Sequence, residues 1–121
     1  GTFRTPFKAA WHPLQGCWGQ YCTQITGNYL FHSSPYNSPN KNDLSYRLYN
    51  QLGTVCSHGC VRLTVADAKW IYDNCPLGTT VSIYNASSLP VPKPSAPWLD
   101  ISSPNRGWDP TDPDPANPWN K

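Results

Sequence analysis

Two cysteines, a histidine and a glycine lie close together in the stretch VCSHGCVRLT. Cys56, His58 and Cys60 are near enough in sequence to share a metal ion, and His32 or Cys75 could complete four ligands. Structural zinc sites are usually built from paired C-x-x-C spacing, which this stretch lacks. A disulfide would account for one of its two cysteines at most. A catalytic thiol explains more of the residues.

Cys60 is the candidate nucleophile. Such a thiol needs a lowered pKa, a nearby base, and backbone amides directed at the oxygen on which charge develops. Gly59 lets the chain turn sharply, so that neighbouring amides can point inward together as an oxyanion hole. Adjacent side chains usually diverge, so His58 is not automatically the base, and it could instead hold the loop. His32, at the end of a predicted strand, is the second histidine that such a site needs, and Ser57 is expected to serve as a turn or cap residue.

Most of the body is predicted to be strand, and His32 lies near the end of one of these strands. Residues 1–34 mix aromatic and β-branched residues with polar ones, and they bend as a hairpin at residues 26–28. Residues 79–84 alternate and are β-branched, which predicts a closing strand. The fold class is therefore expected to be mostly β, a small sandwich or barrel-like sheet.

Two short helices are predicted to flank the cysteine loop. Residues 42–53 place leucines at i, i+4 and i+8, begin with Asn-Asp and end at a glycine, which indicates an amphipathic helix. Thr64 and Asp67 have the T-x-x-D spacing of a capping box, so a second helix should begin there and end near Cys75.

The composition excludes some classes of function. A chain of 121 residues is one domain's worth, and 13% charged residues with a net charge of +2 are too few to indicate nucleic-acid binding. The sequence has no apolar run of membrane-spanning length. Five cysteines are an odd number, which in an exported protein suggests two disulfides and one free thiol, and in a cytosolic protein suggests reduced or metal-bound thiols.

The last part of the chain has a different composition. Nine of the fourteen prolines fall in residues 90–121, and proline removes the amide donors that helices and interior strands require. Such a segment is either a disordered linker or an extended tail that packs back on the body. Three tryptophans favour the packed tail, so we expect a domain at 1–89 and a tail at 90–121.

The motif SHGCVRL, preceded by FHSSPY and followed by DAKWIYDNCPLGTTVSI, resembles the L,D-transpeptidase catalytic domain of the YkuD type. That family's signature is a histidine, a spacer and then Ser/Thr-His-Gly-Cys. GTF near the start is similar to the end of the family's Thr-Pro-x-Gly-x-Phe stretch, and the closing proline-tryptophan tail is similar to those of some secreted Gram-positive members. The resemblance spans roughly residues 1–84.

Three departures from the family pattern stand out. The spacer at residues 33–56 is longer than in many members, because it holds the predicted helix at 42–53. The family's first strands would lie before Gly1, so this copy is expected to be truncated or trimmed. Arg62 stands where one branch of the family has Asn, and matches the other branch.

The resemblance implies a role for each site residue. Cys60 would attack the stem peptide and form a thioester, and His32 would be the base, with its other ring nitrogen fixed by the backbone carbonyl of Ser33. The amides of His58, Gly59 and Cys60 would form the oxyanion hole. Arg62 would anchor polar or anionic substrate groups.

Arg62 could instead pair with Asp67 or Asp73 and pin the second helix. His12 is expected to be a loop residue, although an aromatic-rich substrate channel could use it.

The resemblance also implies the partners and location of the protein. The substrates would be peptidoglycan stem peptides, cross-linked 3→3 outside the cytoplasmic membrane, and carbapenem β-lactams would acylate the thiol. No metal, cofactor or nucleic acid is expected. If water accepted the acyl group from the thioester, the same site would act as a carboxypeptidase. If a protein lysine accepted it, the enzyme would anchor that protein to the cell wall. A non-catalytic wall-binding module is the alternative from another class.

An exported enzyme with a free catalytic thiol benefits if its other cysteines are paired. Cys17 and Cys22 are separated by WGQY, a plausible tight bend, and we expect them to form one disulfide. Cys56 and Cys75 would form the other and tie the second helix to the loop. A rival pairing of Cys56 with Cys60 would block the site and act as a redox switch.

Overall fold

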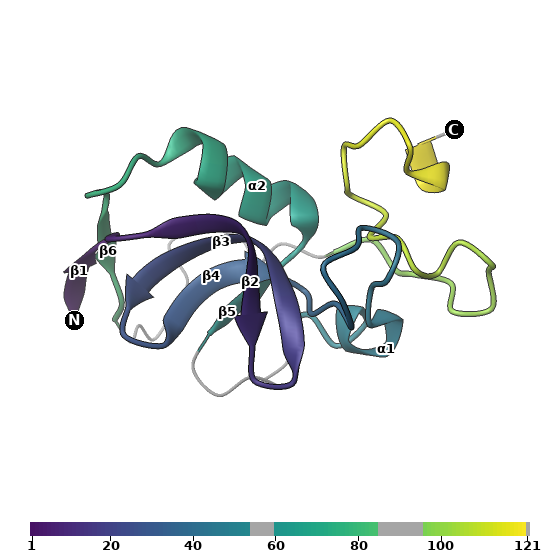
Figure 1. Cartoon of the computed structure of the whole chain (residues 1–121), viewed down its shortest axis with the longest axis horizontal. Coiled ribbons are helices and arrows are strands. Elements are labelled where there is room, and N and C mark those ends of the chain that lie inside the picture. The colour runs from purple at the N-terminus through teal and green to yellow at the C-terminus, as the bar shows by residue number, and fades with distance from the viewer. Residues whose placement is uncertain (54–59, 85–95, 121) are drawn as a thin grey trace.

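The computed structural model describes residues 1–53, 60–84 and 96–120, and it confirms the mostly β fold class. A four-stranded sheet contains, in this order, β2 (Lys8–Leu14), β3 (Cys17–Thr26), β4 (Tyr29–Ser33) and β5 (Val61–Leu63). A second, two-stranded sheet pairs β1 (Thr2–Arg4) with β6 (Thr80–Ser82) near the N-terminus (Figure 1).

The strands of the larger sheet are joined by glycine-containing turns and a crossover connection that the sequence helps to explain. β2, β3 and β4 are antiparallel neighbours, and the turn between β3 and β4 is made by Gly27, with φ of +51°, and Asn28. This is the predicted hairpin bend. β5 runs parallel to β4, and a parallel pair needs a crossover connection, which passes through α1 (Tyr46–Tyr49).

The second predicted helix is confirmed. α2 (Val65–Asn74) begins after Thr64, whose side-chain oxygen accepts a hydrogen bond from the Asp67 amide at 3.3 Å, and it is capped at its end by Cys75. α2 packs against β3 and β4 and lies along one side of the sheet (Figure 1).

The first predicted helix is shorter than residues 42–53. α1 has only four residues, with hydrogen-bonded turns after it. Leu44, the first leucine of the pattern, instead forms a bridge with Tyr36, and its amide donates to the carbonyl of Gly107 at 2.9 Å. The prediction was wrong at this end because the backbone amide of Leu44 is hydrogen-bonded to Gly107, in a distant part of the chain, and not within a helix.

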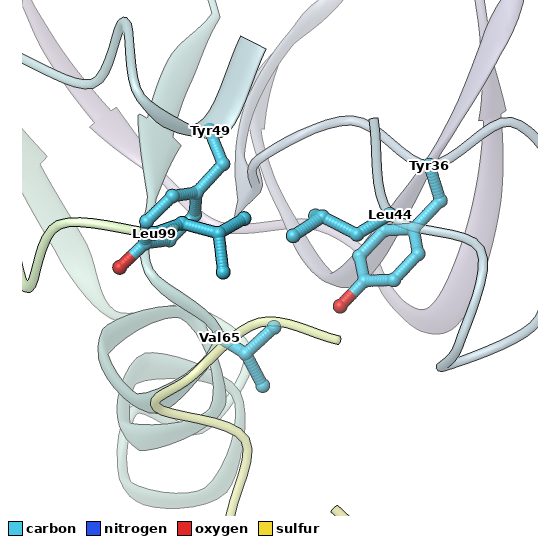
Figure 2. Packing of buried hydrophobic residues seen from close by; sticks show 5 residues of the cluster. All are labelled: Tyr36, Leu44, Tyr49, Val65 and Leu99. Carbon is cyan, nitrogen blue, oxygen red and sulfur yellow. The ribbon is translucent and has the colours of Figure 1, made fainter. Parts of the chain in front are cut away.

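Residues 96–120 pack against the body at the end of the molecule that also holds α1 (Figure 1). They end in a short 3₁₀ helix, η1 (Pro118–Asn120). Leu99 is 1% exposed and joins a buried cluster from three other parts of the chain (Figure 2): Tyr36, Leu44, Tyr49 and Val65. The hydrophobic core therefore includes a residue of the proline-rich segment.

The same segment caps α2. A carboxylate oxygen of Asp109 accepts from the Val65 amide at 3.0 Å, and the hydroxyl of Thr111 accepts from the Ala66 amide at 3.1 Å. Asn117, which is buried, donates to the backbone carbonyl of Asp109 at 2.9 Å and so holds this turn closed. Together with the Thr64 cap, these contacts satisfy the first three amides of the helix.

Candidate active site

A cavity of about 1030 Å³ opens on the four-stranded sheet and contains both His32 and Cys60. Its walls come from the β2–β3 hairpin, the turn at Gly27 and Asn28, and the first residues of the α1 region. Ligand pockets typically have volumes of several hundred to about 1,000 Å³, so this cavity is large enough for a peptide segment. Arg62 also lines it.

The strand register explains why these side chains share one face. His32 in β4 and Arg62 in β5 are direct partners in the parallel ladder. Side chains two positions apart on an extended chain point to the same face, so Cys60, just before β5, lies on the face of Arg62 and His32. α2 packs against the same sheet through β3 and β4, and none of its residues lines this cavity.

His32 is 2% exposed, and its Nδ1 lies 2.5 Å from the backbone carbonyl oxygen of Ser33. This is the carbonyl expected from the family resemblance. A carbonyl can only accept, so the neutral ring carries its proton on Nδ1 and Nε2 presents a lone pair. Burial lowers the pKa of His32, the Ser33 carbonyl opposes this shift, and the charge of Arg62 lowers the pKa further.

Ser33 is itself held firmly in the interior. Its hydroxyl accepts from the Gln20 amide and donates to the Ser34 carbonyl, both at 2.9 Å. The residue that fixes the His32 ring is therefore tied to β3 as well as to its own strand. This is the kind of supporting hydrogen bonding that keeps a catalytic imidazole in one orientation.

The thiol of Cys60 donates to the backbone carbonyl of Asn28 at 3.3 Å. Asn28 belongs to the β3–β4 turn, so the turn predicted from Gly27 also supplies a contact to the candidate nucleophile. The other predicted members of the motif lie outside the described residues: Cys56, Ser57, His58 and Gly59.

The positive charge of Arg62 influences the pKa values of nearby side chains in the cavity. It lowers the pKa of His32 and opposes the burial that raises the pKa of Cys17. Of the two acidic residues considered as its partners, Asp73 forms an ion pair with Lys69 within α2. Arg62 also lines a second cavity, which contains Asp67.

The predicted disulfide between Cys17 and Cys22 is wrong. Both are free thiols, and both lie in β3, where Cys17 is paired with Leu14 and Cys22 with Ala9 of β2. An extended strand rises about 3.3 Å per residue, so Cα atoms five positions apart lie far beyond the ~7 Å limit of a disulfide. Burial raises the pKa of Cys22 to about 12 and also raises that of Cys17, so both thiols stay protonated at neutral pH.

The second predicted disulfide is not formed either. Cys75 is a free thiol at the end of α2, and its predicted partner Cys56 lies outside the described residues. Helix α2 is held at its other end by the contacts of Asp109 and Thr111, so the structure secures this helix without a covalent link.

His12 is in β2 and not in a loop, and it lines the same cavity as His32 and Cys60. Its Nδ1 lies 2.7 Å from the Pro13 carbonyl oxygen, so its Nε2, like that of His32, presents a lone pair. The sequence offers little sign of this position, because proline is uncommon within strands and Pro13 directly follows His12.

Within residues 1–53, 60–84 and 96–120, no three histidine, cysteine or acidic side chains are grouped so that they could hold a metal ion. The same residues contain no helix that is long and apolar enough to cross a membrane.

Comparison with known proteins gives consistent results. Residues 1–83 match the YkuD family, described as the L,D-transpeptidase catalytic domain. A curated relative from Bacillus subtilis (strain 168), "Putative L,D-transpeptidase YciB", is 47% identical over 57 residues, which are 47% of this chain and 28% of the relative.

A crystal structure from Clostridium acetobutylicum ATCC 824 is also similar. It is described as a fused Zn-dependent amidase/peptidase/peptidoglycan-binding domain-containing protein. The match has 38% identity and a TM-score of 0.50, and covers 69% of this chain and 33% of the other. The chain thus spans no more than about a third of the length of either relative.

Proposed function

The chain belongs to the YkuD family of L,D-transpeptidase catalytic domains, and from this premise we propose that it forms 3→3 cross-links in peptidoglycan through a thioester on Cys60. The observation that carries the proposal is the shared cavity of Cys60 and His32, with Nδ1 of His32 bound to the Ser33 carbonyl. A nucleophile and an oriented base are what covalent acyl transfer requires.

In the proposed acylation step, Nε2 of His32 takes the proton of the Cys60 thiol. The sulfur attacks the carbonyl of the third stem residue, whose bond to the terminal D-alanine nitrogen then breaks. His32 returns the proton to this leaving amine, and the acyl group remains on sulfur as a thioester. Because burial keeps His32 neutral, it acts as a general base at the moment of attack.

In the second step, the amine of a neighbouring stem attacks the thioester carbonyl. His32 accepts a proton from that amine, the carbon–sulfur bond breaks, and Cys60 leaves with its electron pair and is reprotonated. The amides of His58, Gly59 and Cys60 are proposed to bind the oxyanion in both steps. Arg62 is proposed to bind anionic groups of the substrate near the thiol.

The family acts on the cell wall, and we propose that this chain is exported and works outside the cytoplasmic membrane, where stem peptides are accessible. Carbapenems are proposed to acylate Cys60, and penicillins to react poorly. Mass spectrometry of the intact protein after incubation with each drug tests this point, because only an activated thiol should gain the mass of the opened ring. A protein that reacts with neither drug would count against the assignment.

The main test is the reaction with defined tetrapeptide-stem muropeptides, followed by product masses. Cys60→Ser should abolish turnover, and His32→Ala should slow acylation by about 10²–10⁴-fold, as for loss of a general base. Cys75→Ser, which removes a thiol outside the cavity, should behave like the wild type.

Cross-linked dimers would support the transpeptidase, and shortened stems alone would indicate a carboxypeptidase. If His32→Ala keeps most of the rate, His58 becomes the candidate base. If the wild type forms no acyl-enzyme at all, the proposed function is wrong.

A further inference from the structure

A second cavity, of about 890 Å³, lies beside the first and shares one residue with it, Arg62. One wall comes from the end of β5 and the start of α2, and includes Asp67. The end of the α1 region and residues 96–98 also line the cavity. The proline-rich segment thus builds part of a cavity that reaches the candidate active site.

Trp98 in this wall is 77% exposed, although the backbone on both sides of it is fixed. The hydroxyl of Tyr49 donates to the Pro97 carbonyl at 2.8 Å. The side chain of Asn50 donates from Nδ2 to the Leu99 carbonyl at 2.8 Å, and its Oδ1 accepts from the Leu99 backbone amide at 3.0 Å. Leu99 itself is buried in the core.

An exposed indole on a fixed backbone is prepared for binding. A large apolar side chain in water is unfavourable, and rigid aromatic anchors are the usual centres of binding energy at recognition surfaces. Because Tyr49 and Asn50 already order the backbone, a ligand that packs on Trp98 does not have to order it again. The carboxylate of Asp67 is among the polar groups that line the same cavity.

We propose, resting on the proposed function, that Trp98 and this cavity bind a sugar ring of the peptidoglycan glycan strand. One face of a pyranose ring carries mainly C–H groups and packs flat on an indole, while its hydroxyls donate to a carboxylate such as Asp67. The stem peptides of the proposed substrate are attached to that strand. A sugar held here would place a stem beside Arg62, at the boundary between the two cavities.

Trp70 offers a matched comparison. It is 61% exposed on α2, but it does not line either cavity. If exposed indole were sufficient for sugar binding, Trp70 and Trp98 would contribute alike. Binding is assigned to Trp98 and not to Trp70, because Trp98 lines a cavity that also contains hydrogen-bonding side chains.

The test is calorimetric titration of the whole chain with a β-1,4-linked N-acetylglucosamine tetramer, which carries no peptide. The wild type should bind it, and Trp98→Ala should weaken binding by about tenfold or more, the loss typical of an aromatic anchor. Trp70→Ala should leave affinity unchanged. Asp67→Asn, which keeps the size of the side chain, should also weaken binding, and circular dichroism of each variant checks that the fold is intact.

Cys60→Ser should bind the tetramer like the wild type, because sugar binding does not need the thiol. The two proposals can therefore fail separately. If Cys60→Ser loses transfer activity but the wild type does not bind the tetramer, the proposed function stands and only the inference about Trp98 is overturned. If Trp70→Ala and Trp98→Ala lose equal affinity for the tetramer, the assignment of the sugar site to Trp98 is wrong. Binding at Trp98 of a free stem tetrapeptide in place of the sugar would overturn the occupant.

Discussion

His32 and its neighbours show how single residues set the chemistry of the candidate site. The Ser33 carbonyl fixes the tautomer, burial keeps the ring neutral, and Arg62 adds a positive charge that disfavours the imidazolium. Cys17 and Cys22 are also near this site, but burial raises the pKa of both thiols. They should therefore not compete with Cys60 as nucleophiles at neutral pH.

The pH dependence of acylation follows from these interactions. Only neutral His32 can accept the thiol proton, so the rate should fall as pH drops through the pKa of His32. Because that pKa is lowered, the acid limb should lie below about 6.5, the usual value for histidine. Arg62→Gln removes a charge that lowers the pKa, so the limb should move to higher pH.

The measurement is the rate of acyl-enzyme formation between pH 4 and 8, with Arg4→Gln as a control because Arg4 is an exposed arginine in β1. Its acid limb should match that of the wild type. A wild-type limb at or above 6.5, or an unchanged limb in Arg62→Gln, would show that His32 is not the titrating base.

At the scale of elements, the clamp on α2 connects the C-terminal segment to the site. β5 carries Arg62 and leads directly through Thr64 into α2, whose first amides are bound by Asp109 and Thr111. Asp109 also accepts from the amide and hydroxyl of Thr111, at 2.7 and 2.6 Å. The position of β5 therefore depends on a turn more than 40 residues later in the chain.

Asp109→Ala should destabilise the fold by about 2–4 kcal/mol, because it removes a helix cap and further buried hydrogen bonds. Asp73→Ala breaks only a surface ion pair with Lys69, and should change stability little. The free energy of unfolding in urea measures both. If the two variants unfold at the same urea concentration, the clamp does not stabilise the helix.

At the scale of the whole molecule, the proline-rich segment belongs to the core. Leu99 packs among Tyr36, Leu44, Tyr49 and Val65 (Figure 2), and Trp119 packs against the same cluster. The nitrogen of the Trp119 indole donates to the Asn105 carbonyl at 2.9 Å. The segment thus contributes to the core through Leu99 and Trp119.

Leu99→Ala should cost about 2–5 kcal/mol, the range for a large-to-small change in a core. Ile101→Ala, two residues further on, removes a side chain that is 36% exposed and should cost much less. Thermal and urea unfolding of the two variants compare them directly. Similar small losses would mean that residues 96–120 only lie on the surface and do not contribute to the folding unit.

The sequence by itself determined the features that depend on neighbouring residues. Thr64 and Asp67 predicted the start of α2, Gly27 predicted the β3–β4 turn, and the histidine and Ser-His-Gly-Cys signature indicated the family. Caps, turns and signatures are local, because the interacting groups lie within a few positions of one another.

Only the tertiary structure decided the rest. It placed Cys17 and Cys22 along one strand as separate thiols, shortened the helix at Leu44, and brought His12 into the cavity. It also joined Asp109 to Val65, 44 positions apart in sequence. Contacts of this kind depend on the strand register and on how a proline-rich segment folds back, and no pattern of neighbouring residues specifies either.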